Sequence, residues 1–224
     1  FRRVLFRSFR TWSAARIAAA TPADALAHPT WKMGSKITVD SASLVNKGLE
    51  AIEAHRLFDL PMDRVDIVVH PESRVHALVE FVDGSTKAQI GEADMRGPIA
   101  YALGYPTRLE AGVPPARLTE LATLRFDAPD LDRFPGLGLA LEAGRRGGSA
   151  PGALIAADDV AVTRFLAGEM RFGGIAALID EALSRFGGRG APRGAAEIMD
   201  LDSDVRAFAA SWKPPASLGG ATGA

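Results

Sequence analysis

The stretch that decides the fold is residues 28–50, HPTWKMGSKITVDSASLVNKGLE. From Val45 onward, apolar residues recur every third or fourth position, which predicts a helix that ends at about Phe58. Asp40–Ser41 is a favourable N-cap pair, so we expect the helix to begin there. The Lys36–Val39 segment before it contains β-branched residues and predicts a brief strand.

Several polar residues in this stretch are suited to binding an anion and a cation. A helix N-terminus offers unpaired N–H groups and the positive end of the helix dipole to an anion such as phosphate. Ser41 adds a hydroxyl, and Asn46 and Lys47 add an amide donor and a cation on an adjoining face. Glu50 follows one turn later, where an acid beside a bound phosphoester can ligate a hard divalent cation.

The same residues also allow a purely structural interpretation. Ser41 can be only an N-cap, and Lys47 with Glu50 only a surface pair worth about 0.3 kcal/mol. Trp31 on the preceding loop could close over a ligand and exclude water, or it could belong to the core. His28, before a proline, could be a hydrogen-bonded structural histidine. The pattern alone leaves both interpretations open.

The middle of the chain predicts a small sheet. Residues 65–69 and 75–82 are rich in β-branched and apolar residues, and 86–90 follows them as a return strand. Asp83–Gly84 is a strong hairpin signal between the last two. Residues 123–126 could form a last strand. We therefore expect a mainly antiparallel sheet.

The remaining segments predict helices. Thr21 followed by proline predicts the start of a short helix. After about residue 130, apolar stripes over 175–186 and 205–212 predict a helical bundle. The fold class is thus α+β: a small mainly antiparallel sheet with helices on one face, followed by a C-terminal helical bundle. The predicted division is a junction at 1–8, an α+β domain at 9–110, a linker at 111–130, a helical domain at 131–212 and a disordered tail at 213–224.

Composition narrows the functional class. The chain has 224 residues, 26 Lys+Arg against 27 Asp+Glu, and no cysteine. Such a balanced charge argues against nucleic acid or an anionic membrane as a partner. The lack of cysteine excludes disulfides and thiolate metal sites, and no run approaches the roughly 20 apolar residues of a spanning helix. Because the chain begins with Phe1 and has four arginines in its first ten residues, we expect it to begin inside a longer protein.

Residues 28–50 closely resemble the substrate-binding segment of the 1-deoxy-D-xylulose 5-phosphate reductoisomerase family. The family pattern is H-P-x-W-x-M-G-x-K-I-x-x-D-S-A-x-x-x-N-K-x-x-E, and this chain meets every fixed position. A second segment, residues 70–103, HPESRVHALVEFVDGSTKAQIGEADMRGPIAYAL, is equally similar. The resemblance runs from about Phe9 to Trp212 and weakens in the helical part.

The resemblance implies roles for individual residues. It assigns Ser41, Asn46 and Lys47 to the phosphate and hydroxyls of the sugar phosphate. His28 would contact the phosphate end, and Glu50 would ligate Mg²⁺ or Mn²⁺, or Co²⁺. His28 and Glu50 are the implied catalytic residues.

The resemblance also implies a flap and an NADPH contact. Trp31 resembles the flap residue that covers the substrate, with Met33 beside it. Gly34 and Met95 match positions near the nicotinamide of NADPH.

Other polar residues favour structural roles. His70 and His76 lack the usual spacing of metal ligands, so hydrogen-bonded support of the site is the favoured interpretation over ligation. Glu92 and Asp94 are expected to be caps or surface acids. We expect Asp158–Asp159 to sit at a helix start and to stabilise its dipole.

Three departures from the family pattern matter. Residues 1–8 look like a foreign junction, with Leu5 where the family has a substrate-binding serine. The Rossmann domain for NADPH and two further metal-binding acids are absent. An Asn-Ala-Ala-Asn-Glu run of the family stands here as residues 155–159, IAADD.

The implied activity is conversion of 1-deoxy-D-xylulose 5-phosphate to 2-C-methyl-D-erythritol 4-phosphate, in the isoprenoid-precursor pathway of the bacterial cytoplasm, by a homodimer. Because no glycine-rich dinucleotide fingerprint follows a strand, we expect this chain alone to be inactive. The competing hypotheses are a non-catalytic phosphosugar-binding or dimerisation module, and an α+β domain without a small-molecule site.

Overall fold

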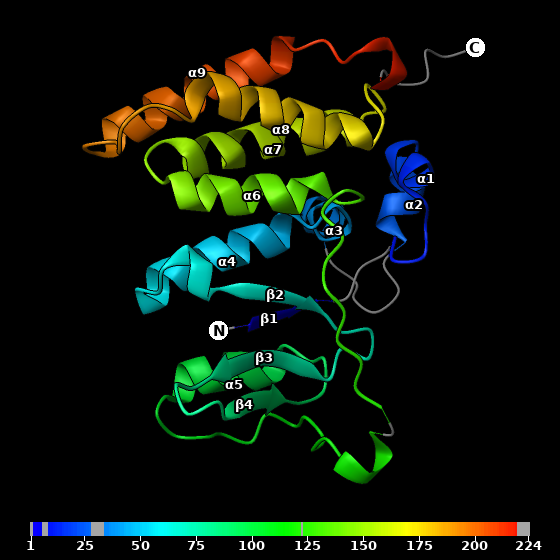
Figure 1. Ribbon diagram of the computed structural model, residues 1–224, viewed down its shortest axis with the longest axis vertical. Coiled ribbons are helices and arrows are strands. Elements are labelled where there is room, and N and C mark those ends of the chain that lie inside the picture. Colours follow the sequence, from blue (N-terminus) through cyan, green and yellow to red (C-terminus); the bar gives the residue numbers. More distant parts are fainter. Residues whose placement is uncertain (1, 6–8, 28–33, 122, 219–224) are drawn as a thin grey trace. The chain divides into compact units, whose positions relative to one another are not determined.

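The computed structural model describes residues 2–5, 9–27, 34–121 and 123–218 (Figure 1). It divides into two compact units. The sheet unit comprises Phe1–Phe6 and Arg64–Pro129, and the helical unit comprises Arg7–Asp63 and Asp130–Ala224.

The sheet unit is built on a four-stranded sheet of order β2-β1-β3-β4. β1 pairs in parallel with β2 and antiparallel with β3, and β3 pairs antiparallel with β4, which confirms a small, mainly antiparallel sheet. The predicted hairpin at Asp83–Gly84 is also confirmed, with the Phe81 N–H donating to the Ser85 carbonyl at 2.8 Å. The elements are β1 (Arg2–Leu5), β2 (Asp66–Val69), β3 (Val75–Glu80), β4 (Thr86–Ile90), α5 (Arg96–Gly104) and the 3₁₀ turn η2 (Leu118–Glu120).

Two details of the sheet differ from the prediction. The strand expected at 123–126 is only a bridge, in which Val69 and Asp127 exchange backbone hydrogen bonds of 2.8 and 2.9 Å. Residues 2–5 form β1 between β2 and β3, a strand that the sequence did not predict. Sequence pattern missed β1 because four residues are too few to establish a period-2 alternation.

The helical unit packs its longer helices against one another, α7 on α8 and α9, and α4 on α6 (Figure 1). This arrangement confirms the C-terminal helical region. α2 begins with the predicted cap, since Thr21 and Asp24 form a capping box. The elements are α1 (Ala14–Ala18), α2 (Pro22–Leu26), α3 (Ser35–Ser43), α4 (Val45–Phe58), η1 (Met62–Arg64), α6 (Pro135–Arg146), α7 (Ala150–Leu166), α8 (Gly173–Phe186), α9 (Ala195–Ser211) and η3 (Ala216–Leu218).

The predicted strand at Lys36–Val39 and the predicted cap at Asp40–Ser41 are wrong. Both segments lie inside α3, and the chain turns at Leu44, whose left-handed φ of 65° separates α3 from α4. Burial of Val39 and the Lys36–Asp40 ion pair, one turn apart at 2.7 Å, favour a helix over the β propensity of these residues.

Other boundaries differ as well. α3 and α4 pack with the C-terminal helices, so the two units do not follow the predicted division into 9–110 and 131–212. Asp158–Asp159 lies in the middle of α7, not at a helix start. Residues 216–218 of the predicted disordered tail form η3, and Arg171 donates a backbone hydrogen bond to the Leu218 carbonyl at 3.0 Å.

Within the described residues, no helix combines the length and the apolar character that a membrane crossing requires.

Candidate functional site

The first two turns of α4 bring together three of the predicted site residues. The Asn46 amide donates to Glu50 Oε1 at 2.9 Å, and the Lys47 ammonium donates to Glu50 Oε2 at 2.7 Å. All three side chains are partly buried. The carboxylate is thus oriented by an amide and a cation one turn before it, as expected of a group held in place for a ligand.

A helix N-terminus adjoins this carboxylate, but four residues later than the sequence predicted. α4 begins at Val45 and has no side-chain cap on Leu44, although the Val45 N–H donates to Ser43 Oγ at 3.3 Å. The N–H groups of the first helical turn have no intrahelical acceptor and carry the positive end of the dipole. Lys47 lies in that turn, so an anion there would meet both.

Ser41 lies in the last turn of α3, on the other side of the Leu44 turn. It is half-buried. Its predicted role as an N-cap is wrong, because α3 continues to Ser43.

The remaining predicted site residues lie elsewhere. His28, Trp31 and Met33 lie outside the described residues. Gly34 is the exposed N-cap of α3 in the helical unit. Met95 belongs to the sheet unit, where it is the N-cap of α5 and its side chain is 56% exposed.

His70 and His76 make hydrogen bonds inside the sheet unit. The buried His70 ring stacks on Phe126, and its Nδ1 lies 2.8 Å from the Arg125 carbonyl. Because a carbonyl oxygen only accepts, this Nδ1 carries the proton. His76 Nε2 lies 3.3 Å from the Gly91 carbonyl.

Two acids of the sheet unit have structural partners. Glu92 pairs with Arg74. Asp94 accepts from the backbone N–H of Arg96 at 2.9 Å and from its guanidinium, and these bonds lower the pKa of Asp94. Both acids therefore act as the cap or surface acid that the sequence predicted.

The donor set does not complete a metal site within the part of the chain that the structure describes. No group of three or more His, Asp or Glu residues there could hold a metal ion. Glu50 can contribute one carboxylate to such a site, and the remaining ligands would have to come from elsewhere.

Sequence reasoning missed an ionic cluster between α3 and α7. Lys36 Nζ contacts Asp40 Oδ2 at 2.7 Å, Asp158 Oδ2 at 2.6 Å and Asp159 Oδ1 at 3.2 Å. The available signal was the pair of acids at 158–159 within a mostly apolar helix, since acids there need a cation if they are buried.

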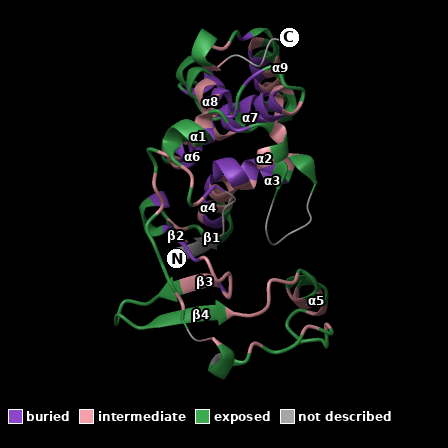
Figure 2. Cartoon of the chain, turned by 90° about the vertical axis from the view of Figure 1, so that its right-hand side faces the viewer, coloured by how far each residue is buried: buried purple, intermediate pink, exposed green. Residues whose placement is uncertain are grey.

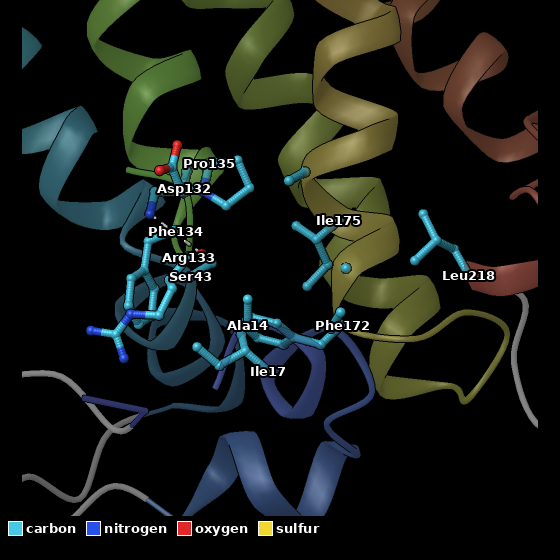
Figure 3. Close-up of a pocket in the computed structure, with 15 residues that line it drawn as sticks. Ala14, Ile17, Ser43, Asp132, Arg133, Phe134, Pro135, Phe172, Ile175 and Leu218 are labelled. Carbon is cyan, nitrogen blue, oxygen red and sulfur yellow. Dashed lines mark hydrogen bonds between the residues drawn. The ribbon is translucent and has the colours of Figure 1, made fainter. Parts of the chain in front are cut away.

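A separate apolar pocket of about 270 Å³ lies in the helical unit (Figure 3). Ile17, Phe134, Phe172 and Ile175 line it, and none of the predicted site residues that the structure describes does. Three polar residues, Ser43, Asp132 and Arg133, also line it, and Arg133 is turned to the carbonyls of Arg10 and Trp12 at 3.1 and 2.8 Å.

Comparison with known proteins shows which family the chain belongs to. Residues 90–208 match the family model of the DXP reductoisomerase C-terminal domain, and residues 7–58 match that of the 1-deoxy-D-xylulose 5-phosphate reductoisomerase C-terminal domain. The chain belongs to the 1-deoxy-D-xylulose 5-phosphate reductoisomerase family.

Curated relatives show how much of the family protein is covered. The chain is 50% identical over 205 residues to the 1-deoxy-D-xylulose 5-phosphate reductoisomerase of Methylobacillus flagellatus, covering 92% of this chain and 52% of that protein. It is 50% identical over 200 residues to that of Chloroherpeton thalassium, covering 89% and 51%. The chain therefore spans about half the length of the curated relatives it matches.

Solved structures are similar in fold. The Zymomonas mobilis reductoisomerase in complex with NADPH matches with a TM-score of 0.85 and 39% identity, over 94% of this chain and 55% of that one. A DOX-P reductoisomerase in complex with NADPH, fosmidomycin and magnesium matches with a TM-score of 0.85 and 41% identity, over 93% and 54%.

Proposed function

We propose that this chain supplies the substrate-binding half of a 1-deoxy-D-xylulose 5-phosphate reductoisomerase in the bacterial cytoplasm. The complete enzyme would convert 1-deoxy-D-xylulose 5-phosphate to 2-C-methyl-D-erythritol 4-phosphate with NADPH and a divalent metal. The observation that carries the proposal is the Glu50 carboxylate held by Asn46 and Lys47 at the start of α4. Family membership supports it.

The phosphate and hydroxyls of the substrate would bind at the α3–α4 junction. Lys47 offers a cation, Asn46 an amide donor, and Ser41 a hydroxyl from the end of α3. The α4 N-terminus adds its dipole, and each such contribution is worth about 0.3–2 kcal/mol. By resemblance, His28 would contact the phosphate end, and Trp31 with Met33 would cover the bound substrate.

Glu50 would be one ligand of Mg²⁺, Mn²⁺ or Co²⁺. Such a hard cation usually takes one or two carboxylates and completes its shell with ligand oxygens and water. When bound it would act as a Lewis acid on the substrate oxygens. Asn46 and Lys47 would orient the carboxylate, because they hold one oxygen each.

NADPH would meet this chain only at a few positions, with Gly34 and Met95 near the nicotinamide. We expect no turnover by the chain alone, since its sequence has no glycine-rich dinucleotide fingerprint after a strand. NADPH oxidation by the purified chain in the presence of substrate would contradict this expectation.

The test restores the missing half from a relative. Residues 9–212 replace the matching segment of the Methylobacillus flagellatus enzyme, and substrate-dependent NADPH oxidation is measured. We expect activity in the chimera and a loss of at least about 100-fold in kcat for E50Q, since that change removes a metal ligand. K47M should raise KM at least about tenfold, because it removes a charge-assisted hydrogen bond to the anion.

E53Q is the matched control, because Glu53 is exposed on the same helix, one turn after Glu50. It should retain the activity of the parent chimera. A folded chimera without turnover that still binds the sugar phosphate would favour the non-catalytic phosphosugar-binding module. Full activity in E50Q would exclude the site described above.

We also propose that the sheet unit pairs with a second copy of the chain. Apolar side chains of this unit are strongly exposed, with Val82 at 105%, Leu103 at 83% and Tyr105 at 71%. Where exposed apolar side chains gather into one patch, they mark an interaction surface. The family's homodimer supplies the expected occupant.

A further inference from the structure

The α3–α7 contact in the helical unit contains an ionic cluster with two buried acids, which the proposed function does not use. Lys36 and Asp40 lie one turn apart on α3, and Asp158 comes from α7. The two carboxyl groups share the Lys36 ammonium through their Oδ2 atoms, at 2.7 and 2.6 Å. Their side chains are only 6% and 1% exposed.

The second oxygen of each carboxyl group has no partner among the residues that the structure describes. Oδ1 of Asp40 and Oδ1 of Asp158 are both buried without a hydrogen bond to the described residues. If such a carboxylate is ionised, burial removes water from both of its oxygens. In return it has only one ammonium, which it shares with the other carboxyl group. Both Oδ2 atoms contact the same ammonium, so the two carboxyl groups are close neighbours and repel each other when both are ionised.

We propose that Asp40 and Asp158 share one proton, so that a carboxylic acid and a carboxylate together hold Lys36 and tie α3 to α7. The protonated group can donate to the other, which provides a partner for an otherwise unpaired oxygen. The ionised group keeps the charge that Lys36 requires. Loss of the proton at higher pH leaves two facing carboxylates on one cation and weakens the contact.

The electrostatics of the two groups agree with this arrangement. Burial, together with the facing Asp40, raises the pKa of Asp158 to about 7 against the attraction of Lys36. Burial also raises the pKa of Asp40. Asp158 is therefore the group that holds the proton in the folded chain at mildly acidic pH.

The remaining charges near the pair come from α7 and α9. Asp159 contacts Lys36 and accepts from Arg206 at 2.8 Å, and although partial burial opposes it, these bonds lower its pKa. Arg206 also binds Asp202 at 2.7 Å. Four carboxyl groups thus face two cations, which favours retention of a proton. The charged groups of the other helices packed on α3 have partners of their own: Asp24 of α2 with Thr21, Lys47 with Glu50 on α4, and Arg145 and Arg146 with Glu142 on α6.

The sign of the pH dependence follows from linkage. A carboxyl group whose folded pKa is raised stabilises the fold fully below its unfolded pKa of 3.8, and this contribution is lost as pH rises to about 7. The Asn side chain of D158N has the shape of aspartic acid and carries an N–H donor at every pH, so D158N should not lose this contribution to stability as pH rises. The ratio of the wild-type unfolding constant to that of D158N should therefore rise about tenfold per pH unit between about pH 4 and 7 and level off above.

The measurement is denaturant unfolding of the 224-residue chain from pH 5 to 8.5, followed by the fluorescence of its three tryptophans, Trp12, Trp31 and Trp212. D202N is the matched control, because it also removes one aspartate charge from the cluster but at a side chain that is 45% exposed. Its unfolding constant should parallel that of the wild type across this range. A flat ratio for D158N, or the same rise in D202N, would overturn the proposal.

A second measurement does not depend on the stability of a variant. The ¹³C carboxyl shifts of labelled aspartate in the wild-type chain are followed against pH, with Asp158 assigned by its absence in D158N. One buried aspartate should titrate near pH 7. If Asp40 and Asp158 both titrate below pH 5, no proton is shared and the proposal fails.

Discussion

The helical unit and the sheet unit differ in how completely they bury apolar side chains. In the helical unit, Leu154, Phe165 and Leu178 are fully buried between α7, α8 and their neighbours. In the sheet unit, Val82 and Leu103 are 105% and 83% exposed. Figure 2 shows the contrast, with buried residues concentrated in α4, α6, α7 and α8 and exposed ones in β4 and α5.

The difference indicates how each unit obtains its stability. The helical unit has the larger apolar core, although Leu57 and Met199 remain 67% and 71% exposed. Its own helices supply the partners of the ionic cluster between α3 and α7. The sheet unit buries few large apolar side chains and leaves Val82, Leu103 and Tyr105 strongly exposed. Changes inside the helical unit should therefore alter folding, and changes on the sheet unit should alter association.

The largest effect is expected from K36M. The change leaves Asp40 and Asp158 buried without their common cation, which costs about 3–5 kcal/mol of unfolding free energy at pH 8. The cost should shrink at pH 5.5, because the buried acids can then be neutralised by protons. Denaturant unfolding at both pH values measures it. R206M should cost less than about 1 kcal/mol, because the acids that it leaves without this cation, Asp159 and Asp202, are 33% and 45% exposed. Equal losses in the two variants would contradict the argument.

A core deletion gives a smaller effect that separates the two units. L178A removes a fully buried side chain of α8 and should cost about 2–5 kcal/mol of unfolding free energy. L103A makes the same change at a side chain that is 83% exposed on α5, and should stay within about 0.5 kcal/mol. Circular dichroism during denaturation follows both. A comparable loss in L103A would mean that the sheet unit has a core of its own at α5.

The sequence predicted the parts of the fold that local chemistry decides. The Asp83–Gly84 hairpin and the Thr21 cap were correct, because turns and caps are set by a few adjacent residues. The end of α4 near Phe58 was also correct. Asn46, Lys47 and Glu50 were brought together because positions three and four apart on a helix adjoin.

What failed depended on partners far away in the sequence. Lys36–Val39 has β-branched residues, yet it is helical because Lys36 pairs with Asp158 from α7, 122 residues later. Asp40 looked like a cap because local pattern cannot show that its side chain turns inward to that ammonium. Tertiary contacts therefore overrode local propensity where α3 meets α7.

A tight contact under the candidate site predicts a further, moderate effect. A methyl group at Gly48 would collide with the Cβ of Ala140, where α4 packs on α6. G48A should therefore cost about 1–3 kcal/mol of unfolding free energy and shift the turn that carries Asn46, Lys47 and Glu50. G138A is the control, since a methyl group there meets nothing within 4 Å and should stabilise α6 by about 0.5–1 kcal/mol. Denaturant unfolding compares them, and a stabilised G48A would mean that the two helices can separate without cost.

The smallest effect on folding, and the sharpest test of the sheet unit, is expected from the double variant V82S/L103S. Both side chains are exposed, so the unfolding free energy should change by less than about 0.5 kcal/mol. If the sheet unit pairs with a second copy, the same variant should shift sedimentation toward the monomer at concentrations where the wild-type chain is dimeric. T163S, on the exposed surface of α7, is the matched control and should sediment like the wild type. A wild-type chain that stays monomeric at high concentration would instead assign this apolar surface to another partner. The contrast between the two units would then remain a contrast in burial alone.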